Sequence, residues 1–482
     1  MMTKQTLQRS TPFALPVKIL QFGQGNFMRG FFDWQIDLLN ERTGLNAGVV
    51  VVRARGGSSA PLLDVQDGLF TVLVRGLDGA GDAVREMRRV DCVQREIDPV
   101  SMFSDFLAQA ANPELRLIVS NTTEAGIAIN DVDCLDDAPP SAFPARLTQL
   151  LWARYQAFGG ALDKGVIVLP CELIDDNGPV LKKAVLHFAR LWQLEAGFLA
   201  WLDGACTFCS TLVDRIVTGY PAAEAAAVEA ELGYTDQFLV AAEYYYLFVI
   251  EGPASLAAEL KLDGADLNIV LVDDIRPFKK RKVSILNGGH TTLVPVALLA
   301  GLTTVGQALA DAEVGAWLAA AIEDDIIPAL DMERTALQAY AGDVLRRFNN
   351  PAIEHRLASI ALNSWSKFAT RVMPQLTRYA ERHDGRLPPR LVLSLAANMV
   401  LYRGDVIELA DEAAHLAWFA RAWAGVLTGS MSLHEMASGW LANRALWGRD
   451  LNDVAGLTTA LAQALEAIEG AGIRAAVQGQ AG

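Results

Sequence analysis

Three polar residues with different chemistry lie close together in the otherwise apolar stretch "RKVSILNGGH" at 281–290: Lys282, Asn287 and His290. A lysine can transfer an alcohol proton if its pKa falls from about 10.4 towards about 7 or 8 through burial and like-charged neighbours. "KKRK" at 279–282 supplies such neighbours. An asparagine amide can donate to an oxygen that becomes negative, and a histidine can orient hydroxyls. The set suits metal-independent hydride transfer to or from a carbonyl.

The spacing of these residues fits one face of a helix. Lys282 and His290 are about 80° apart around a helix axis, and Asn287 and His290 are one turn apart. If this helix opens a C-terminal domain, all three side chains can reach a cleft beneath a nucleotide domain, where ligands are expected. The alternative is a solvated basic loop, followed by a helix in which Asn287 and His290 have structural partners.

A glycine turn follows the first predicted strand, in "ILQFGQGNFMRGFF". Gly23 and Gly25 stand between this strand and a predicted helix, the context in which glycines let a backbone approach a dinucleotide pyrophosphate. Met28 occupies the usual third glycine position, so the motif is incomplete. The sequence predicts a dinucleotide site here, with a ligand-free structural turn as the alternative.

Neighbouring residues extend this predicted cofactor site. Asn26, Phe27 and Arg29 lie in the same turn, where Arg29 adds a positive charge. The second strand ends in "VVVVRARGG", with Arg53 and Arg55 where an acidic residue would hold the ribose of NAD. Taken alone, these arginines favour the 2′-phosphate of NADP.

The first half of the chain alternates apolar, β-branched runs with amphipathic helical stretches. Such runs indicate buried parallel strands in an α/β, doubly wound domain. The predicted strands lie at 17–23, 48–54, 115–121 and 165–171, with another at 267–274. From about residue 283 the pattern becomes helical. We therefore predict a dinucleotide-binding domain over 1–275, a mainly α-helical domain over 276–482, and a frayed tail after about residue 470.

Composition narrows the function classes. The 482 residues carry a formal charge of −15, which argues against nucleic acid or an anionic membrane as the main partner. The five cysteines are an odd number, typical of reduced intracellular thiols; the C-x-x-C formed by Cys206 and Cys209 lacks the further ligands of a zinc site. Without an apolar signal segment or a span of about 18 apolar residues, we expect a cytoplasmic protein.

Several motifs resemble the polyol-specific long-chain dehydrogenases typified by mannitol 2-dehydrogenase. They are "ILNGGH" preceded by Lys282, "VDRIV" at 213–217, "QDGLFT" at 66–71 and the turn from Gly23 to Arg29. Within that family, "SNTTEAGI", "IVLPCELIDDNG" and "FCSTLVDRIVTGYP" are most similar to members that interconvert tagaturonate and altronate. The resemblance runs from about residue 17 to beyond residue 400. It implies a Rossmann-type domain, a helical C-terminal domain and zinc-independent chemistry.

The resemblance also implies roles for single residues. Lys282 is the proton-transferring acid or base, Asn287 polarises the reacting oxygen, and His290 orients the substrate. Thr122 and Glu124 in "NTTEAG" match the cofactor end of the site, and Asp214 in "VDRI" matches a position lining it. The alternatives are a helix cap for Glu124 and a buried ion pair for Asp214.

Lys367 matches a family lysine that contacts substrate, although the arginine eight positions before it is Ser359 here. Arg371 follows Lys367 by one helical turn, so the two side chains can jointly hold a carboxylate. For Arg371, a solvated helix face remains the alternative.

Two departures from the family pattern affect the expected substrate and cofactor. Leu173 stands where mannitol dehydrogenases carry an oxyanion-binding asparagine, for which Asn177 or a water can substitute. The acid after the second strand is missing, yet the resemblance implies NAD, with NADP not excluded. We expect reversible reduction of tagaturonate; the alternatives are a fructuronate or polyol oxidoreductase, or an inactive sugar-acid binding protein.

Overall fold

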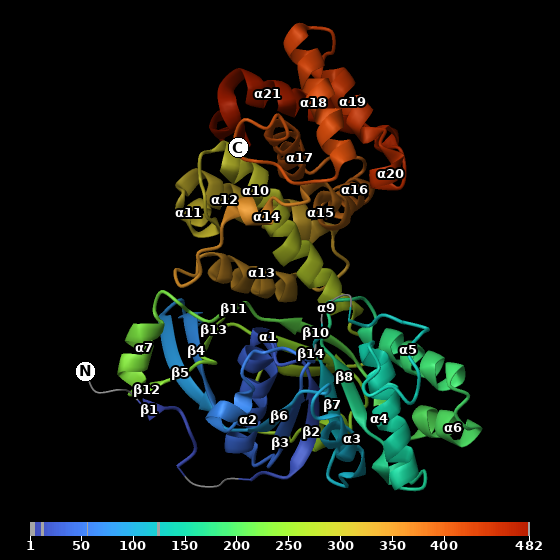
Figure 1. Ribbon diagram of the computed structural model, residues 1–482. Helices are drawn as coiled ribbons and strands as arrows, with labels where there is room; N and C mark the ends of the chain where they lie inside the picture. Colours follow the sequence, from blue (N-terminus) through green and yellow to red (C-terminus); the bar gives the residue numbers. More distant parts are fainter. Residues whose placement is uncertain (1–4, 11–13, 55, 123–125, 481–482) are drawn as a thin grey trace. The chain divides into compact units, whose positions relative to one another are not determined.

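The computed structural model describes residues 5–10, 14–54, 56–122 and 126–480, and these form two compact units (Figure 1). The first unit comprises residues 1–78 and 82–275, and the second comprises 79–81 and 276–482.

A six-stranded parallel sheet forms the centre of the first unit. Its strands follow the order β6-β3-β2-β7-β8-β9. Their bounds are Val93–Ile97, Gly48–Val52, Val17–Phe22, Leu117–Ser120, Ile167–Pro170 and Thr207–Phe208. The four strands predicted in the first half are therefore confirmed as β2, β3, β7 and β8.

Helices cover both faces of this sheet. Ile19 and Val49 pack with the segment that follows β2 along the chain, whereas Leu20 and Val50 pack with α3 to α6 on the opposite face. This alternation of buried residues confirms the doubly wound α/β class. The helical segments of the unit are α1 Asn26–Met28, η1 Arg29–Asp33, α2 Trp34–Thr43, η2 Leu63–Gln66, α3 Phe103–Ala108, η3 Gln109–Ala111, α4 Phe143–Ala157, η4 Leu162–Lys164, α5 Asn177–Leu191, α6 Ala196–Gly204, α7 Ala225–Leu232 and α8 Leu256–Glu259.

Smaller sheets that the sequence did not predict complete the described part of this unit. A mixed sheet has the order β11-β13-β4-β5, a second has the order β10-β14-β15, and β1 pairs with β12. The bounds are β1 Gln5–Thr6, β4 Phe70–Leu77, β5 Ala83–Val90, β10 Ser210–Asp214, β11 Val217–Gly219, β12 Tyr234–Thr235, β13 Val240–Glu243, β14 Leu247–Glu251 and β15 Ile269–Val272. The predicted strand at 267–274 is β15, and it lies outside the main sheet.

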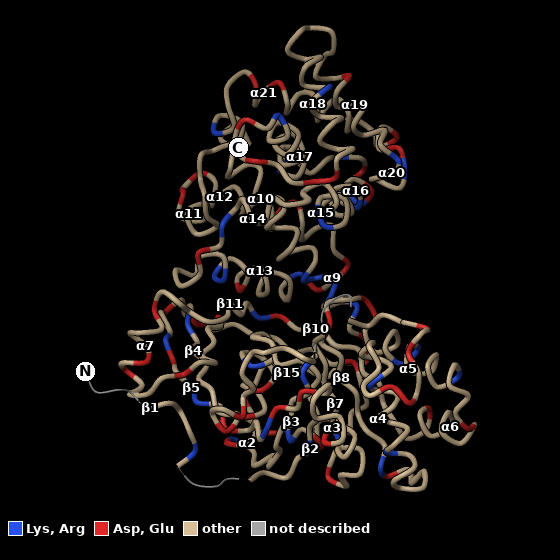
Figure 2. The backbone as a smooth tube through the Cα atoms, in the orientation of Figure 1, with Lys and Arg blue, Asp and Glu red and all other residues tan. Residues whose placement is uncertain are grey.

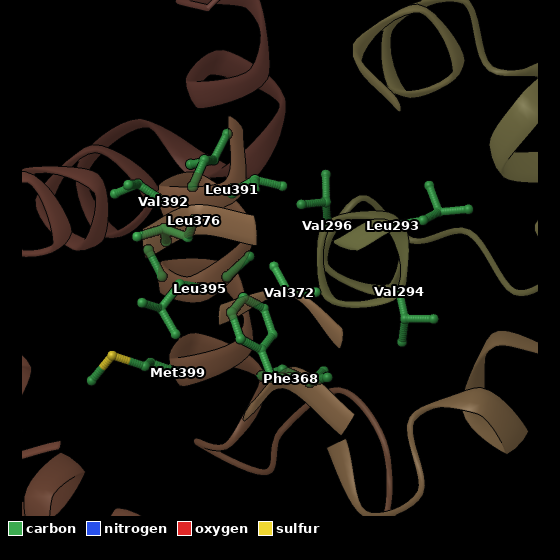
Figure 3. Close-up of a cluster of buried hydrophobic side chains, with 14 of the residues drawn as sticks. Leu293, Val294, Val296, Phe368, Val372, Leu376, Leu391, Val392, Leu395 and Met399 are labelled. Carbon is green, nitrogen blue, oxygen red and sulfur yellow. The ribbon is translucent and has the colours of Figure 1, made fainter. Parts of the chain in front are cut away.

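The second unit is helical, as predicted. Its helical segments are α9 Arg276–Arg281, η5 Lys282–Asn287, α10 Gly288–Leu299, α11 Val305–Ala310, α12 Ala312–Ala320, η6 Ala321–Ile326, η7 Ile327–Ala329, α13 Arg334–Phe348, α14 Leu357–Ile360, α15 Ser364–Arg371, α16 Met373–Arg382, α17 Pro389–Leu401, α18 Ala413–Thr428, α19 Leu433–Leu441, α20 Arg444–Trp447, η8 Leu451–Asp453 and α21 Leu457–Gln478. The central helix α10 is buried over nearly its whole length. Figure 3 shows α10 with Val296 on the side that faces the apolar side chains of α15 and α17, and with Leu293 and Val294 on the other side of the helix.

The expectation of a frayed tail is wrong. Helix α21 has a kink at Gly472 and then continues to Gln478, and its Ile473 and Val477 are buried in the core of the second unit. Trp317 on α12 donates its indole N–H to Gln480 at 3.0 Å. Two apolar anchors spaced one turn apart therefore suffice to hold a segment whose composition predicts little burial.

Candidate functional site

The glycine turn after β2 has one glycine that the fold requires and one that it does not. Gly23 has φ +113°, and a Cβ there would lie 2.7 Å from the backbone oxygen of Asn121. Gly25 precedes α1 with φ −62°, and a Cβ there would have no atom within 4 Å. Open space at a helix N-terminus is what the close approach of a pyrophosphate needs. The turn therefore fits a dinucleotide.

Gly30, two positions after the usual third glycine position, takes the packing role of the third glycine. Met28, at the usual position, is fully buried. A Cβ at Gly30 would lie 2.9 Å from a methyl group of Val217 on β11 and 3.6 Å from Ala242 on β13. Gly30 thus permits the close helix-to-strand packing that the third glycine normally provides, which explains why the motif is incomplete in the sequence.

Arg29 shapes the turn from within. Its guanidinium donates to the side-chain oxygen of Asn26 at 2.6 Å and to the carbonyl of Gln24 at 3.3 Å. Burial lowers the pKa of Arg29, against the opposing effect of Asp33. Phe27 stacks on Phe31 with ring centroids 4.9 Å apart. The structure therefore gives the predicted cofactor residues Asn26, Phe27 and Arg29 internal contacts that fix the turn.

Arg53 has a structural role that the sequence did not reveal. It is 2% exposed and forms a 2.7 Å ion pair with Glu96 on β6. Its terminal nitrogens donate to the carbonyls of Ser58, Ala60 and Pro61. Because these partners engage Arg53, it no longer supports the argument for NADP. The other arginine of that argument, Arg55, lies outside the described residues.

Thr122 lies where β7 ends, close to the centre of the sheet. Its backbone N–H and hydroxyl donate to one oxygen of Glu172 at 2.9 and 3.0 Å, and Ser120 donates to the other. Burial raises the pKa of Glu172, and these donors oppose that effect. Thr122 also lines a cavity of about 690 Å³. Predicted Glu124 lies outside the described residues.

Leu173, at the position of the family's oxyanion-binding asparagine, and Asn177, its proposed substitute, differ in their environment. Leu173 is 61% exposed. Asn177 is buried, and its amide donates to the carbonyls of Pro170, Glu172 and Thr211 while its oxygen accepts from the N–H of Thr211. These bonds engage the Asn177 amide within the protein, so it lacks the free donor that an oxyanion would need.

Asp214 ends β10 and is 5% exposed. The next residue, Arg215, donates to the carbonyls of Gly30 and Glu243 and lies 4.1 Å over the ring of Trp34. The "VDRI" motif therefore joins β10 to the segment after the glycine turn through Arg215, and the role of Asp214 in the site stays a prediction.

In the second unit, Lys282 and Asn287 mark the two ends of a π-helical segment, η5. A π-helix closes i→i+5 hydrogen bonds, so residues five apart lie one wide turn apart. Asn287 and His290 are then separated by one turn of α10. The turn that contains Lys282 and Asn287 is therefore wider than that of the regular helix that the sequence predicted, and the common side of Lys282, Asn287 and His290 stays a prediction.

The η5 segment is anchored on its other side. Ile285 and Leu286 are buried in the core, and the Ser284 hydroxyl accepts from the Gln375 amide at 2.8 Å. Lys282 and Asn287 remain partly exposed. The preceding helix α9 carries the basic residues that Figure 2 marks along this part of the chain.

His290 lies in an aromatic and cationic environment. Its ring stacks on Phe348 with centroids 3.9 Å apart and meets His355 edge-on at 4.8 Å. Burial, followed by the positive charges of His355, Arg347 and Arg371, holds the pKa of His290 well below its usual range. The buried Nε2 of His290 has no hydrogen-bond partner among the described residues. A neutral imidazole here can orient a substrate hydroxyl without carrying charge.

Lys367 and Arg371 lie one turn apart on α15, as predicted. The Lys367 ammonium donates to the carbonyl of Ile360 at 2.8 Å, and burial and Arg371 lower its pKa. The backbone of Arg371 approaches Gly288, where a Cβ would lie 3.2 Å from its carbonyl oxygen. Among the described residues, neither Lys367 nor Arg371 forms an ion pair with a carboxylate. The pair can therefore accept an external anion.

Phe348, His355 and Arg347 are site residues that the sequence reasoning missed. Phe348 and Arg347 end α13, and His355 lies in the loop before α14. No motif links them to Lys282, because only tertiary packing brings α13 to α10. In the sequence, the available signals were an isolated histidine and an arginine pair outside any motif.

Within the described part of the chain, no helix is long and apolar enough to cross a membrane, and no three His, Cys, Asp or Glu side chains gather as metal ligands. All five cysteines are free, and burial raises the pKa of both Cys206 and Cys209 to about 11. These thiols are therefore protonated near neutral pH.

Comparison with known proteins agrees with this architecture. The mannitol dehydrogenase Rossmann domain matches residues 17–264, and the mannitol dehydrogenase C-terminal domain matches residues 274–469. Two solved structures share the fold at 22% identity. D-sorbitol dehydrogenase in substrate-free form has a TM-score of 0.78, covering 96% of this chain and 95% of that one. Pseudomonas fluorescens mannitol 2-dehydrogenase, a ternary complex with NAD and D-mannitol, has a TM-score of 0.68, covering 99% of this chain and 96% of that one.

Curated relatives are more similar in sequence. Altronate oxidoreductases of Yersinia enterocolitica and Klebsiella pneumoniae are each 52% identical, over 96% of this chain and 96% of theirs. The altronate oxidoreductase of Pectobacterium atrosepticum is 50% identical, over 96% of this chain and 97% of its own length. With both domain models matched in order along the chain, the protein belongs to the mannitol dehydrogenase family of nicotinamide-dependent oxidoreductases.

Proposed function

We propose that the protein is an NAD-dependent oxidoreductase that reversibly reduces the keto group of tagaturonate to the secondary alcohol of altronate. The observation that carries this proposal is that Lys367 and Arg371, one turn apart on α15, have no carboxylate partner among the described residues, and that Arg371 adds to the positive charge around His290. A neutral polyol offers such a pair only hydroxyl oxygens, whereas a sugar acid supplies a carboxylate, which forms stronger, charge-assisted hydrogen bonds. The names of the relatives, altronate oxidoreductase, support the same substrate.

The side chains of the second unit have distinct roles in this proposal. When bound, NADH supplies the hydride that reduces the carbonyl carbon. Lys282, as an ammonium, gives a proton to the carbonyl oxygen, and Asn287 donates a hydrogen bond to that oxygen as negative charge builds. In the oxidative direction, neutral Lys282 removes the hydroxyl proton.

Two further groups position the substrate. Arg371, with Lys367, holds the carboxylate; an arginine matches the planar geometry of that group. Neutral His290 hydrogen-bonds a hydroxyl of the sugar chain, and the stack on Phe348 fixes the plane of its ring. These contacts orient the substrate without adding charge beside the reacting carbon.

Among cofactors, we propose NAD because the sequence resemblance favours it and because Arg53, the main sequence argument for NADP, pairs with Glu96. The test is oxidation of altronate with NAD, followed by identification of the keto product by chromatography against tagaturonate. Formation of tagaturonate with matching growth of reduced nicotinamide absorbance is expected. Nucleotide binding without turnover of any sugar acid would instead indicate a binding protein that has lost the reaction.

A further inference from the structure

The cavity of about 690 Å³ in the first unit lies at the carboxyl ends of β3 and β7. Ala54, just after β3, forms one wall, and residues 139–143 at the start of α4 form another. In sheets of this order, the adenosine ribose of a dinucleotide lies beside the end of the second strand, where an acid normally holds its 2′-hydroxyl. That strand is β3, and Arg53 follows it in place of an acid.

Among the described residues, Arg146 is the charged side chain that lines this cavity. It comes from the first turn of α4 and is 7% exposed. One terminal nitrogen donates to the carbonyl of Ala54 at 3.0 Å and to that of Ser141 at 3.3 Å. The guanidinium thus spans from α4 to the segment after β3, which is the ribose side of the cavity.

Arg146 has donors that the protein does not use. Its Nε is buried and has no partner among the described residues. Arg154, two turns later on the same helix, differs: its Nε and both terminal nitrogens donate to backbone carbonyls. Arg154 is a structural arginine, whereas Arg146 has hydrogen-bonding capacity left for a ligand.

The nearby carboxylates have their own partners. Asp133 accepts from the backbone N–H groups of Ser141 and Ala142. Asp98, beyond Gly56, accepts from the N–H groups of Gly57 and Val100. Neither carboxylate pairs with Arg146 in a salt bridge among the described residues. Within that part of the chain, the ribose side of the cavity therefore presents a cation in place of the usual acid.

We propose that Arg146 is the cofactor-selecting residue, donating to the 2′ substituent of the adenosine ribose, so that the cavity accepts a 2′-phosphate as well as a 2′-hydroxyl. This rests on the nicotinamide cofactor of the proposed function and adds that discrimination between NADH and NADPH is weak. A carboxylate at this place would repel the phosphate, whereas a guanidinium binds either group as a donor.

The test is titration of NADH and of NADPH, without sugar, followed by nicotinamide fluorescence. For the unmodified protein we expect the two dissociation constants to differ by no more than about tenfold. Arg146→Met should weaken NADPH binding by about 10- to 100-fold more than NADH binding, the size of a lost charge-assisted hydrogen bond. Arg146→Lys, which keeps the charge, should recover most of the NADPH affinity.

Two further variants keep the test decisive if Arg146→Met does not fold. Ala54→Asp places a carboxylate on the same wall and should selectively weaken NADPH binding. Lys183→Met, on the exposed part of α5, removes a positive charge away from the cavity and should change neither affinity. Equal losses for both nucleotides in Arg146→Met, or strong exclusion of NADPH by the unmodified protein, would overturn the proposal. Failure to bind either nucleotide would instead refute the cofactor assignment itself.

Discussion

The glycine turn of the first unit and the Lys282 segment of the second both include a π-helical stretch, yet they offer a ligand different things. In the turn, Arg29 and Asn26 bond to each other, and the open space lies around the backbone of Gly25. In the second unit, the buried side chains of Ile285 and Leu286 and the bond from Gln375 to Ser284 anchor η5, while Lys282 and Asn287 are partly exposed. The comparison leads to a hypothesis: the first region binds its ligand through the main chain, and the second acts through its side chains.

The largest expected effect is on the side-chain region. Lys282→Ala should lower kcat by about 10²- to 10⁴-fold, the usual contribution of a general acid or base, while NADH affinity is retained. Lys280→Ala, two positions earlier, is the matched control and should keep most of the rate. Steady-state kinetics with NADH titration measures both. Near-normal turnover of Lys282→Ala would remove this lysine from the chemistry.

Arg371 tests whether the second unit selects an anion. Arg371→Met should raise KM for tagaturonate by about 10- to 100-fold, because a charge-assisted pair with the carboxylate is lost. A neutral ketose lacks that carboxylate, so its KM should not change. If both substrates lose affinity equally, Arg371 acts through the fold and not through recognition.

The backbone region should respond to added atoms. Gly25→Val should weaken NADH binding by at least about tenfold, yet leave the thermal midpoint nearly unchanged, since the new Cβ meets no protein atom within 4 Å. Gly23→Ala, in contrast, should lower stability by about 1–3 kcal/mol, because φ is positive and Asn121 is too close. Unchanged NADH affinity in Gly25→Val would show that the turn holds no pyrophosphate.

The smallest expected effect is a dependence of stability on pH in the second unit. Burial and neighbouring cations depress the pKa of His290 below its ordinary value of 6.5. Below that pH, His290 is protonated in the unfolded chain but stays neutral in the folded protein. The free energy of unfolding is therefore highest above about pH 6.5 and falls as the pH decreases. His290→Asn should reduce this slope by up to about 1.4 kcal/mol per pH unit. Denaturant unfolding at several pH values measures it, and an unchanged slope would contradict the buried, neutral imidazole.

The sequence predicted the strands that are buried on both faces, because these appear as continuous apolar runs. Continuous apolar runs became β2, β3, β7 and β8, because parallel strands covered on both faces need such residues. The smaller sheets were missed, since edge strand β5 carries charged side chains along its exposed face and lacks an apolar run. The tail was mispredicted because two buried side chains, Ile473 and Val477, outweighed its small and polar composition.

The candidate site was only partly predictable for a related reason. Lys282, Asn287 and His290 lie in one local motif, so their spacing places them together. Whether an arginine is available to a ligand depends on distant partners: Glu96 engages Arg53, while Arg146 reaches Ala54 from another helix. Local patterns do not specify such tertiary contacts.

The most direct measurement is the rate of NADH oxidation with tagaturonate, compared with fructuronate and fructose under identical conditions. We predict that tagaturonate is reduced fastest, and that kcat/KM for fructose, which has no carboxylate, is lower by at least about 100-fold. Equal or faster reduction of fructose would contradict the central claim that the cationic environment of His290 selects a sugar acid.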